Sequence, residues 1–146
     1  MTMGARKYSG TKVADVMTRD PLTVGAWETI GQADRLMAEN NIRQIPVVQD
    51  RDLIGIVTDR DIRSFLSGSL AESPETRERA LNTEVGGIMT TEPITVSPED
   101  DLEDVVELLI NEKIGGIPVL DQAEGLVGIV TYVDVLRCFL NQLQEG

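Results

Sequence analysis

The strongest constraint on the fold is an internal repeat, because the second half of the chain restates the first half in the same order. A shift of 72 residues, rising to 73 from Leu53 onward, superposes three pairs of segments: Met17–Thr18 on Met89–Thr90, Ile45–Val47 on Ile117–Val119, and Gly55–Thr58 on Gly128–Thr131. Ordered matches across about 55 residues indicate the duplication of one structural unit. The fold must therefore accommodate the same element order twice.

Each repeat predicts the order β-α-β-β-α, and with it a mixed α/β (α+β) fold. Short β-type runs alternate with amphipathic runs of helical period. In repeat 1 we expect strands at Leu22–Val24, Gln44–Val48 and Leu53–Val57, and helices at Thr29–Asn40 and Asp59–Leu66. In repeat 2 we expect strands at Ile94–Val96, Gly116–Leu120 and Leu126–Val130, and helices at Leu102–Glu112 and from Tyr132 to about Leu143.

Polar residues mark the expected helix starts. Thr11 and Thr83 are expected N-caps of short lead-in helices that begin the two repeats and end near Met17 and Met89. Ser97 combines an N-cap residue with Pro98 at a position that suits the first turn, so we expect these two residues to start the helix containing Leu102–Glu112.

We expect four segments along the chain. Residues 1–10 form a flexible lead-in, residues 11–66 the first repeat, residues 67–82 a linker and residues 83–146 the second repeat with its C-terminal helix. Within the linker, Pro74–Leu81 is expected to be a short helix. One repeat is too small for a comfortable core, so we expect both copies to pack as one pseudo-two-fold module.

The composition argues against an enzyme. The chain has no histidine and one cysteine, Cys138, which removes His-based triads, His-ligated metals, thiolate clusters and an intramolecular disulfide. We therefore expect no catalytic site, no metal site and a reducing, cytoplasmic environment. No run approaches the roughly 20 apolar residues of a membrane span.

The net charge of −12 disfavours nucleic acid or an anionic membrane as a partner. The charge is unevenly divided. Thr11–Leu66 carries seven basic and nine acidic residues, whereas Thr83–Gly146 carries two basic and thirteen acidic residues. The first repeat is therefore the better equipped of the two to hold a phosphate.

The pattern Gly-h-h-Thr-x-x-Asp, with h apolar, ends a predicted strand and opens a predicted helix in both repeats. It contains Thr58 and Asp61 in repeat 1, and Thr131 and Asp134 in repeat 2. A helix N-terminus attracts phosphate, and a carboxylate one turn further can accept hydrogen bonds from a ribose diol. The alternative is a capping box, in which both side chains only satisfy the helix amides.

A second shared segment, Ile-Pro-Val, lies about a dozen residues upstream of each motif. Proline lacks an N–H group, so a strand that starts with it leaves a gap in its ladder, where an adenine edge could hydrogen-bond. An ordinary strand start is the better explanation of the segment when it is taken alone. Repeat 1 has Arg43 and Gln44 just before this segment, whereas repeat 2 has Gly115 and Gly116.

Together these motifs resemble a pair of cystathionine-β-synthase (CBS) domains over about Thr11–Leu140. The resemblance implies a tandem module with two clefts, in which threonine and aspartate bind phosphate and ribose while main chain near the proline faces adenine. Carried over to this chain, the first site comprises Thr58, Asp61, Arg43, Arg60, Ile45 and Pro46. The second site comprises Thr131, Asp134, Ile117 and Pro118.

The resemblance implies a stand-alone, non-catalytic sensor that binds an adenosine-containing ligand in a cleft between the repeats and modulates an unknown partner or its own assembly. AMP, ADP or ATP is the expected ligand, and S-adenosylmethionine or a cyclic dinucleotide remains open. The alternative is a structural dimerisation module with empty clefts. In either case we expect a homodimer held by Leu102–Ile110 and Leu136–Leu143, whose apolar surface exceeds what one chain can bury.

Overall fold

The computed structural model describes residues 10–68 and 73–145. Residues 1–9 of the expected lead-in lie outside this range. The chain divides into two compact units, which we describe separately: unit 1 contains Met1–Pro21 and Ile94–Gly146, and unit 2 contains Leu22–Pro93.

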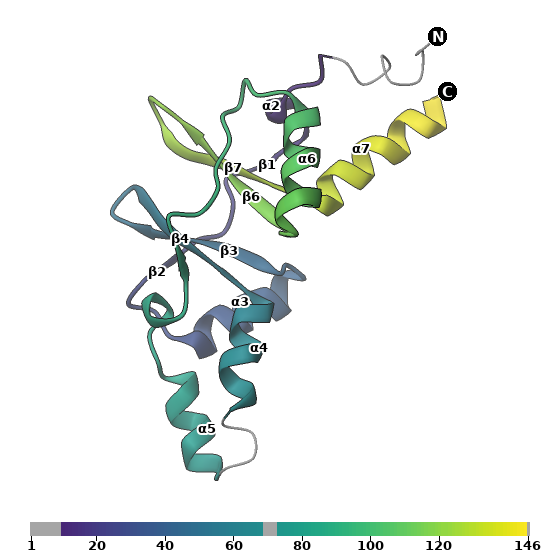
Figure 1. The fold of residues 1–146 in the computed structure, drawn as a ribbon. Helices are drawn as coiled ribbons and strands as arrows, with labels where there is room; N and C mark the ends of the chain where they lie inside the picture. The colour runs from purple at the N-terminus through teal and green to yellow at the C-terminus, as the bar shows by residue number, and fades with distance from the viewer. Residues whose placement is uncertain (1–9, 69–72, 146) are drawn as a thin grey trace. The chain divides into compact units, whose positions relative to one another are not determined.

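Unit 2 is a four-stranded sheet with helices α3 and α4 along one face (Figure 1). Its strand order is β2-β3-β4-β5, with β2 parallel to β3 and the other neighbours antiparallel. The strands are β2 (Val24–Gly25), β3 (Gln44–Gln49), β4 (Asp52–Thr58) and β5 (Thr90–Thr91). The helices are α3 (Ile30–Asn40), α4 (Asp59–Ser67), α5 (Pro74–Leu81) and the 3-10 turn η1 (Val85–Gly87). The apolar faces of sheet and helices enclose one core, which includes Ile30, Ile45, Val57 and Ile62.

Unit 1 repeats this plan with the strand order β1-β7-β6. Its strands are β1 (Thr18–Arg19), β6 (Gly116–Asp121) and β7 (Gly125–Thr131), and its helices are α2 (Val13–Val16), α6 (Leu102–Glu112) and α7 (Tyr132–Glu145). An isolated parallel bridge from Val96 to Val119 takes the place of β2. The Asp101 carboxylate lies 2.7 Å from Nζ of Lys12, and it raises the pKa of that ammonium group.

The first short strand of each sequence repeat completes the sheet of the other repeat. β5 lies in repeat 2 but pairs with β4 of repeat 1, and β1 lies in repeat 1 but pairs with β7 of repeat 2. Close packing at glycine permits this arrangement. A Cβ atom on Gly128 would lie 2.9 Å from the Thr18 carbonyl oxygen, and one on Gly55 would lie 2.8 Å from that of Thr90. The glycine of the shared motif therefore makes room for the incoming strand.

The mixed fold predicted from the repeat is confirmed. The helix predicted at Pro74–Leu81 has those bounds, and Ser73 caps it. Two details of the second repeat were wrong. The expected strand Ile94–Val96 reduces to the single bridge at Val96. Ser97 does not cap α6, because its amide donates to the Asp100 carboxylate at 2.8 Å and the chain makes a turn before the helix begins.

The predicted caps of the lead-in helices were also displaced. Lys12 and Glu84 occupy the N-cap positions of α2 and η1 in place of Thr11 and Thr83. The main chain of both threonines makes tertiary hydrogen bonds instead. The carbonyl of Thr11 accepts from the Leu102 amide at 2.9 Å, and the carbonyl of Thr83 accepts from the Ile30 amide at 2.8 Å. Each lead-in is thus docked on an amphipathic helix of its own unit.

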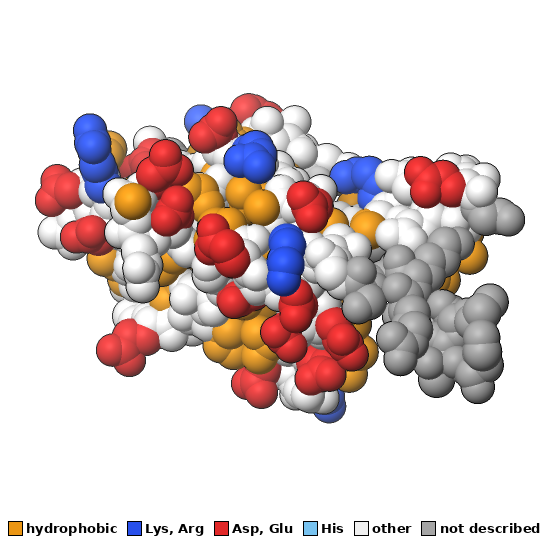
Figure 2. All heavy atoms as spheres, turned by 90° about the horizontal axis from the view of Figure 1, so that it is seen from above, with side chains coloured by type: hydrophobic (Ala, Val, Ile, Leu, Met, Phe, Trp, Pro, Cys, Tyr) orange, Lys and Arg blue, Asp and Glu red, His pale blue; other side chains and the backbone are white. Residues whose placement is uncertain are grey.

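Acidic side chains predominate over basic ones on the face shown in Figure 2, in keeping with the net charge of −12. Apolar side chains are also exposed. α7 presents five large apolar side chains that are between 45% and 58% exposed: Val133, Leu136, Phe139, Leu140 and Leu143. Across the described ranges 10–68 and 73–145, no helix has the length and apolar character needed to cross a membrane.

Candidate functional site

Both copies of the Thr-x-x-Asp motif lie where a strand runs directly into a helix. Thr58 ends β4 and is the N-cap of α4, and Thr131 ends β7 directly before α7. The first amide of α4 donates to the carbonyl of Arg43 at 3.0 Å, and the first amide of α7 donates to that of Gly115 at 3.2 Å. The residue two positions before the Ile-Pro-Val segment therefore lies beside the first turn of the helix in both units.

In unit 2 the motif forms a reciprocal capping box. The Thr58 amide donates to Oδ2 of Asp61 at 3.0 Å, and the Asp61 amide donates to Oγ1 of Thr58 at 3.1 Å. Both residues are half-buried. Within the described part of the chain, neither Oδ1 of Asp61 nor the hydroxyl proton of Thr58 has a hydrogen-bond partner. Capping therefore leaves an acceptor and a donor available side by side.

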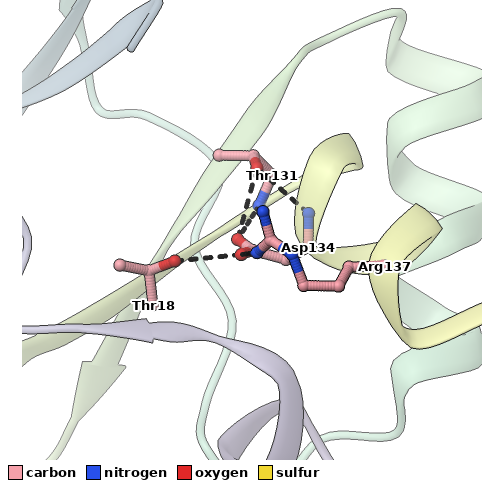
Figure 3. A network of polar contacts seen from close by, with 4 residues as sticks. All are labelled: Thr18, Thr131, Asp134 and Arg137. Atoms are coloured by element: carbon pink, nitrogen blue, oxygen red, sulfur yellow. Dashed lines mark hydrogen bonds and ion pairs between the residues drawn. The ribbon is translucent and has the colours of Figure 1, made fainter. Parts of the chain in front are cut away.

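In unit 1 the same motif belongs to a larger network (Figure 3). Oδ2 of Asp134 accepts from the amide of Thr131 at 2.9 Å and from its hydroxyl at 3.2 Å. Oδ1 accepts from the hydroxyl of Thr18 at 2.9 Å and lies 3.7 Å from Nη1 of Arg137. Figure 3 shows the four side chains pointing toward one another from β1, β7 and α7. The Asp134 side chain is only 6% exposed, so a buried carboxylate is satisfied by its own chain.

The cations of the first site stand at the start of α4. Arg43 and Arg60 are exposed, and neither makes an ion pair with another described residue. Arg63 is engaged with Asp59 at 3.5 Å, one helical turn away. The structure thus places Arg43, Arg60, Thr58 and Asp61 around one helix N-terminus, where an anion is favoured.

Sequence reasoning missed Thr18 and Arg137 as neighbours of the second motif. The repeat did single out Thr18, since Met17–Thr18 matches Met89–Thr90. Its proximity to Asp134 depends on the pairing of β1 with β7, which joins residues more than a hundred positions apart. Arg137 has no arginine counterpart in repeat 1, so the repeat gave no reason to single it out.

The Ile-Pro-Val segments contribute core side chains and main chain. Ile45 and Ile117 are fully buried, and Pro46 and Pro118 are buried beside them, so these side chains serve the core. The carbonyl of Pro118 accepts from the Val96 amide at 3.1 Å. A ligand can therefore meet these segments through neighbouring main-chain groups only, and an adenine contact there stays a prediction.

One family model matches both halves of the chain. The family model described as CBS domain matches residues 13–68 and matches again over residues 85–141. The chain is also 37% identical over 117 residues to the inosine-5'-monophosphate dehydrogenase of Korarchaeum cryptofilum. That match covers 80% of this chain but 22% of the relative, so the chain spans about a fifth of that relative's length.

Two solved structures resemble the chain over most of its length. The crystal structure of CBSX2, a CBS-pair protein of Arabidopsis thaliana, in complex with AMP has a TM-score of 0.77 and 30% identity. The match covers 90% of this chain and 98% of that one. The CBS domain pair of protein MJ0100, in complex with 5'-methylthioadenosine and S-adenosyl-L-methionine, has a TM-score of 0.77, 28% identity and the same two coverages.

Proposed function

The chain belongs to the CBS domain family and carries a pair of these domains, and from that premise we propose that it is a non-catalytic regulatory module that binds an adenosine-containing ligand. AMP, ADP or ATP is the ligand we favour, and S-adenosylmethionine is the alternative within the same chemical class. Structures of similar CBS pairs with AMP and with S-adenosylmethionine support this choice. Ligand binding then modulates a partner protein or the assembly of the module itself.

The observation that carries the proposal is that Thr58 and Asp61 of unit 2 still have hydrogen-bonding groups without a partner among the described residues. Oδ1 of Asp61 is available to accept from a ribose hydroxyl, and Oδ2 keeps a lone pair beyond the bond from Thr58. A vicinal diol can therefore bridge the two oxygens without breaking the cap of α4. Hydrogen bonds to a charged acceptor contribute about 1.5–3 kcal/mol each.

The phosphate has its own partners at the same helix start. The amides of Asp59 and Asp61 are already used by Arg43 and Thr58. The groups still available to a phosphate include the Thr58 hydroxyl proton and the guanidinium groups of Arg43 and Arg60. Arginine suits this task because its planar fork donates two hydrogen bonds to one anion.

Calorimetry with AMP tests the proposal. We expect Asp61→Asn, which keeps an oxygen to accept from the Thr58 amide, and Asp61→Ala to weaken AMP binding about tenfold to a hundredfold. Asp52→Ala is the control, because Asp52 is an exposed carboxylate of the same unit, at the far end of β4. A wild-type chain that binds none of AMP, ADP, ATP or S-adenosylmethionine at millimolar concentration would contradict the proposal.

A second candidate function is a structural dimerisation module with empty motifs. The observation in its favour is the row of exposed apolar side chains on α7, which suits self-association without any ligand. Thermal unfolding separates the two functions. A ligand at a hundred times its Kd stabilises the native state by about 2.7 kcal/mol, whereas an empty module gains nothing from added nucleotide.

A further inference from the structure

The two motifs share a sequence but differ in how many of their polar atoms are already bonded. A carboxylate offers about four lone-pair positions. At Asp134 three are occupied by the Thr131 amide, the Thr131 hydroxyl and the Thr18 hydroxyl, and Arg137 faces the same oxygen as Thr18. At Asp61 only the bond from the Thr58 amide is present among the described residues.

Strand register alone does not produce this difference. Thr18 in β1 lies opposite Ile129, and Thr90 in β5 lies opposite Ile56, the equivalent position of the other unit. Thr18 donates to its aspartate at 2.9 Å. Both threonines are exposed, but Thr90 makes no hydrogen bond to Asp61 in the described structure. One threonine of an equivalent pair is thus bonded to the motif, and the other is not.

We propose that the Thr18 hydroxyl closes the second motif to ligand by holding the Asp134 oxygen that a ribose diol would need, so that the Asp61 motif is the one that binds. The inference rests on the proposed function. A ligand at Asp134 would have to displace Thr18 and re-aim Thr131, whose hydroxyl proton is already donated. It would also have to reach a side chain that is 6% exposed.

The number of AMP molecules bound per chain tests this inference by calorimetry. We expect one for the wild type and two for Thr18→Val, which keeps the β-branched shape and removes only the hydroxyl. Thr18→Ser keeps the hydroxyl and is expected to bind one. Thr90→Val is the matched control and is also expected to bind one. Two molecules bound by the wild type, or one bound by Thr18→Val, would overturn the inference.

A ligand-independent measurement separates this inference from the proposed function. If Thr18 holds Asp134, the losses of melting temperature caused by Thr18→Val and Asp134→Ala overlap, and the double variant loses less than their sum. The losses from Thr90→Val and Asp61→Ala are expected to add. If no variant binds AMP, the proposed function has failed, and additive losses for Thr18 and Asp134 would then overturn the contact itself.

Discussion

At the residue scale, the glycine that opens the shared motif decides whether the lead-in strand can dock. A Cβ atom on Gly128 would lie 2.6 Å from Sδ of Met17 and 2.9 Å from the carbonyl oxygen of Thr18. The methionine side chain can turn away, but the strand carbonyl cannot. Gly128→Ala therefore forces β1 away from β7.

We expect Gly128→Ala to lower the free energy of unfolding by about 1–3 kcal/mol, the usual cost of overpacking. Gly68→Ala is the matched control, because Gly68 has φ −69° and its nearest contact for a Cβ is 3.9 Å away, at the Phe65 carbonyl. Urea unfolding measures both. Equal stability of the two variants would show that the approach of β1 to Gly128 does not constrain this residue.

The motif residues could be found from the sequence, but their bonding could not. Spacing alone placed Thr58 and Asp61 at a helix start, because strand and helix periods meet there. Whether a carboxylate oxygen is free or occupied depends on tertiary neighbours. Thr18 and Thr90 occupy equivalent positions in the repeat and pair at equivalent positions of their sheets, yet one bonds its aspartate and the other does not.

At the element scale, local patterns predicted the long elements and failed at the short ones. α6 covers the predicted amphipathic stretch Leu102–Glu112, because its apolar residues follow the helical period throughout, although the start predicted at Ser97 and Pro98 was wrong. β1 and β5 contain two residues each. Such strands have no periodicity of their own and exist because another part of the unit offers an edge to pair with. The sequence of each lead-in segment therefore predicts a short helix and does not predict the strand that follows it.

The residues that end α3 and α6 differ in how well they tolerate a left-handed backbone. α3 and α6 both end in a residue of left-handed conformation, Asn41 with φ 53° and Lys113 with φ 55°. Asparagine tolerates this region, whereas a residue such as lysine is strained there by about 1–2 kcal/mol. Lys113→Gly relieves that strain but adds freedom to the unfolded chain.

We expect Lys113→Gly to raise the free energy of unfolding by about 0.5–1 kcal/mol. Asn41→Gly, at the equivalent end in unit 2, is expected to change it by less. Thermal unfolding of the two single variants measures the difference. The explanation is wrong if Lys113→Gly is neutral or destabilising while the dihedral angles of the end are retained.

At the scale of the whole molecule, a strongly negative net charge coexists with an exposed apolar helix face. The chain has a net charge of −12, which favours a dispersed state through self-repulsion. α7 nevertheless exposes Leu136, Leu140 and Leu143 by 58%, 51% and 55%. Their spacing of four and three residues puts them on one face of the helix. A row of leucines on one face is a surface that water disfavours.

We expect the chain to be a homodimer in which this leucine row of α7, together with α6, meets a second copy. α6 contacts α7 in the same unit, and its Ile110 is 66% exposed. A standard interface removes about 800 Å² from each partner. The dimer is expected with or without AMP, because no residue of the unit 2 motif belongs to α7 or α6.

Light scattering at tens of micromolar chain tests the dimer. We expect Leu136→Asp with Leu140→Asp to give a monomer, since two buried carboxylates without partners are costly to desolvate. Asn141→Asp with Gln144→Asp adds the same charge to the same helix while the leucine row stays intact, and we expect that variant to remain dimeric. If both double variants dissociate, acidic repulsion rather than the loss of apolar contact separates the subunits. A wild-type chain that is monomeric under these conditions contradicts the prediction outright, because the exposed leucines would then face water.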